Sequence, residues 1–142
     1  MRRGTTLFEL VMALTIAGFL GALAAPRFGE ALDHLAVRRA VGEAAMFYET
    51  ARFGAILQGS RVRIEFGPDS MIAVYERAKD SVFLRRDGPS KDRVTLRTSR
   101  VVIRILPTGI GSGGSNTTLV FKRGVYAESL TTSRLGRLKR WR

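Results

Sequence analysis

The sequence contains no cysteine, and its only histidine is His34. Without cysteine, a disulfide framework, a thiolate metal site and a thiol nucleophile are all excluded. The absence does not argue for the cytosol, because an extracytoplasmic domain of this size can fold without disulfides. His34 stands between Asp33 and Leu35 with no second histidine to complete a metal or catalytic site. We therefore expect it to be a solvated or interface residue.

Motifs that would support an enzyme are also missing. The stretch from Gly109 to Gly114 is rich in glycine, but it lacks the lysine and hydroxyl of a P-loop, and a strand rather than a helix is expected after it. Ser60, Ser70 and Ser81 stand beside turn residues, which explains them without a nucleophilic role. The sequence predicts no enzyme activity, no metal site and no cofactor.

Acidic residues are scarce, with 12 against 24 lysines and arginines and a net charge of +12. Without Arg2 and Arg3 the side-chain charge is still +10, so the excess belongs to the rest of the chain. It indicates either an anionic partner, such as lipid headgroups, an acidic protein or nucleic acid, or a solvated arginine-rich surface. Hydrophobic content of 45% and a length of 142 residues fit one ordinary globular domain besides an N-terminal segment.

The segment from Arg2 to Pro26 is an apolar run whose only charge after Arg3 is Glu9. A lone carboxylate in lipid costs roughly 2.5–3.5 kcal/mol at mid-membrane and less near an interface, so Glu9 should have a partner. One interpretation is a secretory signal cleaved after Ala22-Leu23-Ala24, giving a periplasmic protein that begins at Ala25 and carries a lectin-like or headgroup-binding sheet. A plain transmembrane anchor is another, although Leu10 to Ala25 alone is short for a span.

A helical pattern continues beyond Pro26. Apolar residues recur at helical spacing, polar residues fill much of the other face, and Gly59 stands in the position of a helix C-cap. Because proline removes one backbone hydrogen bond, we expect one long helix from about Thr5 to about Gln58, kinked or loosened near Pro26. Its first half faces lipid, and its second half packs against the remainder of the chain.

That remainder predicts an antiparallel sheet. Strands are expected at residues 61–66, 71–75, 82–84, 94–96, 101–106, 117–122 and 125–131, with turns at 67–70 and 123–124 and a loop over 107–116. The predicted fold class is α+β, with a long N-terminal helix packed through its amphipathic half on a C-terminal antiparallel β-sheet domain.

The residues Gly4-Thr5-Thr6-Leu7-Phe8-Glu9 followed by an apolar helix resemble the class III signal of type IV pilins and type II secretion pseudopilins. The resemblance implies cleavage by prepilin peptidase between Gly4 and Thr5, methylation of the new N-terminus, and a retained glutamate at Glu9. Pro26 also stands where such helices commonly carry a proline. The family usually has phenylalanine at the first mature position, where this chain has Thr5.

The order of helix and strands, the turn Pro107-Thr108-Gly109 and the final Ser133-Arg134-Leu135-Gly136-Arg137 resemble the GspH/FimT group of minor pseudopilins and minor pilins. This implies a leader (1–4), a transmembrane and assembly helix (5–26), its amphipathic half (27–59) and a β-sheet domain (60–142). The implied function is that of a type II secretion pseudopilus subunit in the bacterial inner membrane, single-pass, with its C-terminal domain in the periplasm. Its implied partners are other pseudopilins or pilins, prepilin peptidase, and either secreted cargo or DNA.

Glu9 and the basic C-terminus are the candidate functional residues. Cleavage would place an amine on Thr5, and the amine of a neighbouring subunit would neutralise Glu9 and fix the axial register. In the FimT branch, a basic C-terminal region around a Gly-Arg motif is implicated in DNA capture, which is the alternative function here. The corresponding residues are Arg134, Arg137, Lys139, Arg140 and Arg142, with Trp141 among them. Otherwise the C-terminus is a charged final strand with Leu135 and Leu138 packed on the sheet, or a frayed tail from Lys139.

Overall fold

The computed structural model describes residues 6–77, 80–113 and 116–141, except for the side chains of residues 23–26. The predicted cleavage site at Gly4 and Thr5 lies outside these ranges. The chain divides into two compact units, one up to Leu32 and the other from Asp33 onward. Helix α1 (Leu7–Leu57) contributes to both units, as the helical pattern predicts, and continues through Pro26 as one element.

Both ends of α1 have recognisable caps. At the start, the Glu9 backbone N–H donates to Thr6 Oγ1 at 3.3 Å, and the Thr6 backbone N–H donates to Glu9 Oε2 at 3.0 Å. This reciprocal pair is a capping box. At the end, Gly59 has a positive φ of 55°, and the Ser60 N–H donates to the Ala55 carbonyl at 3.1 Å. Because glycine adopts this conformation without strain, the predicted C-cap at Gly59 is confirmed.

In the first unit, every described side chain from Thr6 to Ala22 is exposed, including large apolar ones such as Leu7, Phe8 and Phe19. The only charged residue from Leu7 to Pro26 is Glu9. The helix is long and apolar enough to cross a membrane. Within the described part of this unit, the apolar side chains are left uncovered, and an exposed apolar surface of this extent is typical of contact with lipid or with another protein chain.

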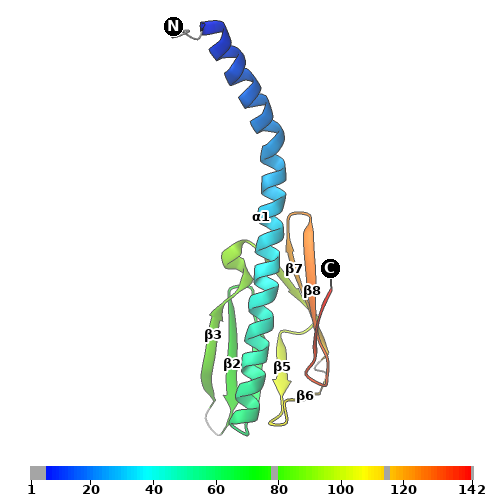
Figure 1. Ribbon diagram of the computed structural model, residues 1–142. Coiled ribbons are helices and arrows are strands. Elements are labelled where there is room, and N and C mark those ends of the chain that lie inside the picture. The colour runs from blue at the N-terminus through cyan, green and yellow to red at the C-terminus, as the bar shows by residue number, and fades with distance from the viewer. Residues whose placement is uncertain (1–5, 78–79, 114–115, 142) are drawn as a thin grey trace. The chain divides into compact units, whose positions relative to one another are not determined.

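The second unit contains two antiparallel sheets rather than the single predicted sheet. The strand order in the five-stranded sheet is β3-β2-β1-β5-β6, and in the four-stranded sheet it is β4-β7-β8-β9. The strands are β1 (Arg61–Phe66), β2 (Ser70–Glu76), β3 (Ser81–Asp87), β4 (Thr95–Thr98), β5 (Val102–Ile105), β6 (Gly111–Ser112), β7 (Thr117–Arg123), β8 (Tyr126–Thr132) and β9 (Leu138–Trp141). A short 3₁₀ helix, η1 (Pro89–Asp92), precedes β4. In Figure 1, β2 and β3 lie to one side of α1, and β7 and β8 to the other.

Two segments differ from the predictions. The expected loop over 107–116 contains the two-residue strand β6, which pairs with β5. The prediction of a frayed tail from Lys139 is wrong, because every residue of β9 pairs with a residue of β8. Of the two leucines expected to pack on the sheet, Leu138 contacts the core, but Leu135 is 63% exposed in the turn before β9.

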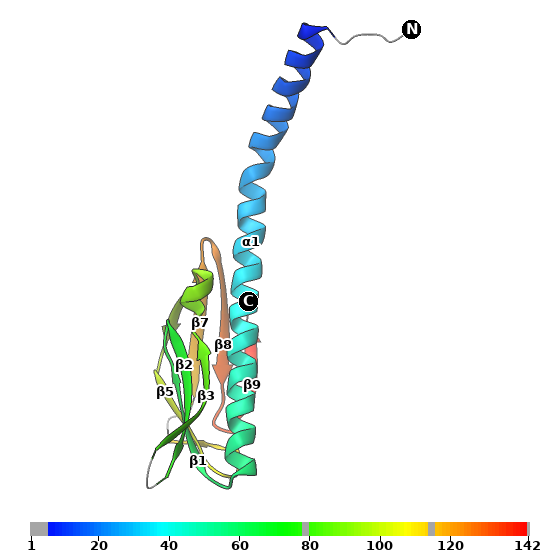
Figure 2. The same ribbon diagram turned by 90° about the vertical axis from the view of Figure 1, so that its left-hand side faces the viewer.

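The core forms where residues 33–57 of α1 meet the inner faces of both sheets. Figure 2 shows β1, β2 and β7 on the same side of the helix. The helix contributes small residues such as Ala44, Ala51 and Ala55, which allow close approach, and the large side chains of Phe47 and Tyr48. Strand residues alternate into this core, as in β1, where Val62, Ile64 and Phe66 are buried. The α+β class predicted from the sequence is therefore confirmed.

Candidate functional site

The carboxylate of Glu9 has a partner within its own chain. Glu9 Oε2 accepts hydrogen bonds from the Thr6 backbone N–H at 3.0 Å and from Thr6 Oγ1 at 3.3 Å. These bonds satisfy groups at the helix N-terminus, where a negative charge is also favoured by the helix dipole. The pattern Thr6-x-x-Glu9 is the sequence signature of a capping box. From the sequence, we expected only a partner from another subunit for Glu9.

The C-terminal motif is a tight turn between β8 and β9. The Ser133 N–H donates to the Arg137 carbonyl at 2.8 Å, and the Gly136 N–H donates to the Ser133 carbonyl at 2.9 Å. Gly136 has a positive φ of 79°. A Cβ at this position would lie 2.6 Å from the Gly109 carbonyl oxygen and 2.7 Å from Arg52 Nε. Glycine is therefore required at position 136, because any other residue would strain the backbone and its Cβ would clash with the neighbouring turn.

This turn meets the Pro107-Thr108-Gly109 turn beside α1. Arg52 Nε donates to the Gly109 carbonyl oxygen at 2.9 Å, and the Gly111 N–H donates to the Arg134 carbonyl at 2.8 Å. The hydrogen bond between Gly111 and Arg134 thus joins two motifs that are separate in the sequence, and Arg52 of the helix binds the first of them. Sequence reasoning singled out both glycine turns but missed Arg52, which had no signal beyond its place on the polar face of the helix.

The five basic residues predicted as one cluster separate in the structure. Arg134 and Arg137 are exposed in the turn, and Arg142 lies outside the described residues. Lys139 and Arg140 are neighbours on β9 and so point to opposite faces of the sheet. Arg140 Nη2 reaches α1, where it donates to the Arg38 carbonyl at 3.3 Å, whereas Lys139 Nζ lies 3.7 Å from the centre of the Trp141 ring on the other face.

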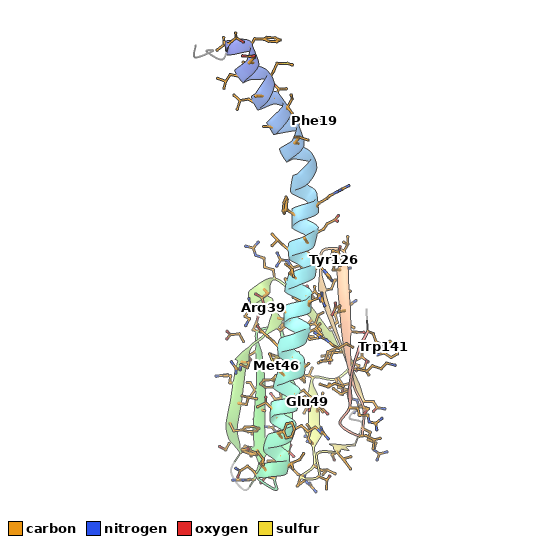
Figure 3. All side chains as sticks on the ribbon, viewed as in Figure 1. Phe19, Arg39, Met46, Glu49, Tyr126 and Trp141 are labelled. Carbon is orange, nitrogen blue, oxygen red and sulfur yellow. The ribbon has the colours of Figure 1, made fainter. Side chains whose placement is uncertain are left out.

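That other face, the outer face of the four-stranded sheet, gathers cations from three strands. The strand register aligns Arg97, Val120, Ser129 and Trp141 in one row across β4, β7, β8 and β9. Lys122 and Lys139 occupy the rows on either side, with Thr118 and Thr131 beside Lys139. No described strand residue on this face is acidic. Figure 3 shows Trp141 beside β9 and away from α1.

The charge excess is concentrated in the same part of the chain. From Arg93 onward there are 11 lysines and arginines but a single acidic residue, Glu128, which is buried. On the five-stranded sheet, two of the cations form ion pairs. Arg63 contacts Asp80 at 3.0 Å, and Arg104 contacts Glu76 at 2.9 Å. The described residues of the four-stranded sheet and its turns therefore carry an excess of positive charge.

The remaining candidates have structural explanations. The His34 ring packs against the Tyr126 ring of β8 with centroids 4.9 Å apart, so His34 is an interface residue between helix and sheet. Within the described part of the chain, no group of three metal-ligating side chains comes together. Pro26 lies inside α1.

The second unit, a helix packed on antiparallel sheets, has the fold of pilin-like proteins. Two crystal structures of the type IV minor pilin FimU from Pseudomonas aeruginosa, in space groups P21 and P65, are similar to this chain with TM-scores of 0.62 each. The first is 16% identical over 72% of this chain and 86% of FimU, and the second is 14% identical over 74% and 92%. A search of curated protein sequences finds no match.

The family model described as type II transport protein GspH matches residues 40–136, which is more than half of the sequence. The chain belongs to the GspH family. The match begins in the part of α1 that packs on the sheets and ends at Gly136, so it includes Arg52 and both glycine turns.

Proposed function

We propose that this protein is a minor pseudopilin, a structural and assembly subunit of a type II secretion pseudopilus. Membership of the GspH family supports the proposal. The observation that carries it is the apolar segment of α1, whose described side chains from Thr6 to Ala22 are all exposed and which holds one carboxylate, Glu9, in its first turn. A helix of this composition is suited to lipid before assembly and to packing among other helices afterwards.

In this proposal the chain is inserted once in the inner membrane, with its C-terminal domain in the periplasm. The 20 residues from Leu7 to Pro26 match the length needed for a bilayer core about 30 Å thick. Prepilin peptidase cuts between Gly4 and Thr5. The amine of Thr5, with or without a methyl group, then meets Glu9 of a neighbouring subunit and sets the register between them.

A second surface supports assembly. Leu35, Phe53 and Leu57 are 60%, 57% and 80% exposed on α1 in the second unit. Their spacings of eighteen and four positions place them on one face of the helix. An exposed apolar stripe of this kind indicates contact with another chain, and the helices of other pseudopilins are the partners that the proposal names.

The first residue of the mature chain tests the proposal. A chain that begins at Thr5 follows the prepilin route, whereas a chain that begins at Ala25 is an ordinary secreted protein with no assembly helix.

The outer face of the four-stranded sheet favours a second candidate, a minor pilin that holds DNA. Arg97 and Lys122 make no ion pair within the described residues, and the face carries hydroxyl groups of Ser129 and Thr131 besides Trp141. Cationic side chains contact phosphates, hydroxyl groups donate hydrogen bonds to the phosphate oxygens, and an aromatic ring can stack on a base. The turn arginines Arg134 and Arg137 would extend this surface.

Binding of the full chain to duplex DNA, measured in detergent at increasing salt, tests this candidate. The double variant Arg97→Gln/Lys122→Gln is expected to lower the slope of log affinity against log salt by about 1–2, because up to two phosphate contacts are lost. The double variant Arg61→Gln/Arg85→Gln removes the same charge from the other sheet and should change the slope little. Absence of DNA binding by the unmodified chain at about 100 mM salt would contradict the DNA candidate.

A further inference from the structure

The five-stranded sheet ends at β3, an edge strand in the described part of the chain. Five of its seven side chains are exposed. An edge strand presents backbone N–H and C=O groups that another extended chain can pair with. The edge is not covered by α1, which packs on the inner face of the sheet. Because the opposite edge strand, β6, has only two residues, β3 is the longer edge at which this sheet can accept a further strand.

A groove of about 450 Å³ runs between this edge and α1. Met46 and Thr50 line it from the helix, Leu84 and Arg86 from β3, and Lys91 from η1. Leu84 and Arg86 face the groove because they pair with the core residues Ala73 and Met71 of β2. Figure 3 shows Met46 and Arg39 on the side of α1 near β3. The pairing of β3 with β2 shifts register at Phe83 and is regular over residues 84–87, so a strand added along residues 84–87 would point every second side chain into this groove.

The charges in the groove favour an acidic occupant. Glu43 is already held by Lys91 Nζ at 2.9 Å and by Arg39 Nε at 3.0 Å. Partial burial raises the pKa of Glu43, but the hydrogen bonds from Lys91 and Arg39 prevail and hold this pKa below its usual value. Arg86, by contrast, forms no salt bridge with a carboxylate of the described residues. Asp87 also lines the groove and follows Arg86 at the end of the strand.

We propose that β3 binds an extended acidic segment of a partner protein by strand addition. One inward side chain of that segment is apolar and packs on Leu84 and Met46. The inward side chain two positions along, about 7 Å away, is a carboxylate that pairs with Arg86. A second copy of this chain fits less well, because its β3 would bring another Arg85 and Arg86 to the same edge.

This inference goes beyond the proposed function, because it needs only the second unit and an exposed β3. Recognition would combine backbone hydrogen bonds along the edge with two side-chain contacts in the groove. The hydrogen bonds select an extended conformation of the partner segment, and the side-chain contacts select its sequence.

A defined peptide tests the proposal. The probe is a blocked, fluorescein-labelled nine-residue peptide with threonine at the outward positions and isoleucine and glutamate alternating at the inward ones. Titrated with the full chain in detergent, it is expected to show saturable binding by fluorescence anisotropy. Arg86→Gln should weaken binding roughly tenfold, as expected for a lost charge-assisted hydrogen bond. Arg85→Gln removes the same charge from the opposite face of β3 and should change affinity by less than about twofold.

Two N-methylated versions of the peptide separate strand addition from charge attraction. Methylation of the alternate amides that pair with β3 should abolish binding, whereas methylation of the other alternate set should leave it nearly unchanged. Hydrogen exchange of Val82 to Arg86 should slow only with the peptides that bind. Equal binding of both methylated peptides, equal weakening by the two arginine variants, or no saturable binding would overturn the proposal.

Discussion

The Glu9→Gln variant is expected to be cleaved after Gly4 but to fail to enter the pseudopilus. In the assembled state the proposed partner of Glu9 is a cationic amine of a neighbouring subunit, and glutamine offers it no charge in a low-dielectric environment. Removing one member of a buried ion pair leaves the other uncompensated, which typically costs about 3–5 kcal/mol. Incorporation is measured from the amount of the variant recovered in sheared or cross-linked pseudopili, and processing from the mass of the membrane-bound chain.

The capping box makes Glu9→Gln more informative than Glu9→Ala. Glutamine at this position can still accept the hydrogen bond from the Thr6 N–H, because Glu and Gln both complete a capping box. Alanine removes the cap as well as the charge, at a further cost of about 1 kcal/mol to the helix start. If Glu9→Gln assembles as well as the unmodified chain while Glu9→Ala does not, then Glu9 acts as a helix cap and the register argument is wrong.

Gly136→Ala is expected to lower the free energy of unfolding by about 2–4 kcal/mol. Part of the loss comes from the positive φ of 79°, which alanine adopts only with strain. The larger part comes from a Cβ placed 2.6 Å from the Gly109 carbonyl oxygen and 2.7 Å from Arg52 Nε. Because the backbone oxygen is fixed by its own turn, the two turns would have to separate and the hydrogen bond from Arg52 would lengthen.

Urea unfolding of the full chain in detergent, followed by the fluorescence of Trp141 on the neighbouring strand β9, measures this loss. Gly59→Ala is the matched control, since Gly59 also has a positive φ but nothing lies within 4 Å of an added Cβ. The Gly59→Ala substitution should lower the free energy of unfolding by about 1 kcal/mol, through backbone strain alone. Equal losses for the two variants would show that the contact between the glycine turns contributes nothing to stability.

Much of the fold could be predicted from the sequence because its patterns are strong. Helical periodicity and Gly59 predicted α1 to within two residues at the start and one at the end, and strict alternation predicted β1 at Arg61–Phe66. Alternation marks a strand but does not identify its partners, so one sheet was expected where two are formed. The two-residue strand β6 is Gly111–Ser112, and neither residue favours a strand by itself.

The functional surfaces were harder to predict because they depend on register. The basic residues near the C-terminus are adjacent in sequence, yet the alternation of β9 sends Arg140 toward α1 and Lys139 to the outer face. Arg97 and Lys122 join Lys139 only through the pairing of β4, β7, β8 and β9, which no local pattern specifies. The Thr6-x-x-Glu9 box, by contrast, is a local pattern and was available from the sequence.

Mass spectrometry of the intact chain and of its N-terminal peptide, on protein recovered from membranes of cells that contain a prepilin peptidase, tests the central claim most directly. The account predicts a mature chain that begins at Thr5, with or without an added methyl group, and an unprocessed chain that begins at Met1 when the peptidase is absent. A mature chain that begins at Ala25 would contradict it, because Glu9 would then be removed with a signal peptide and no assembly helix would remain.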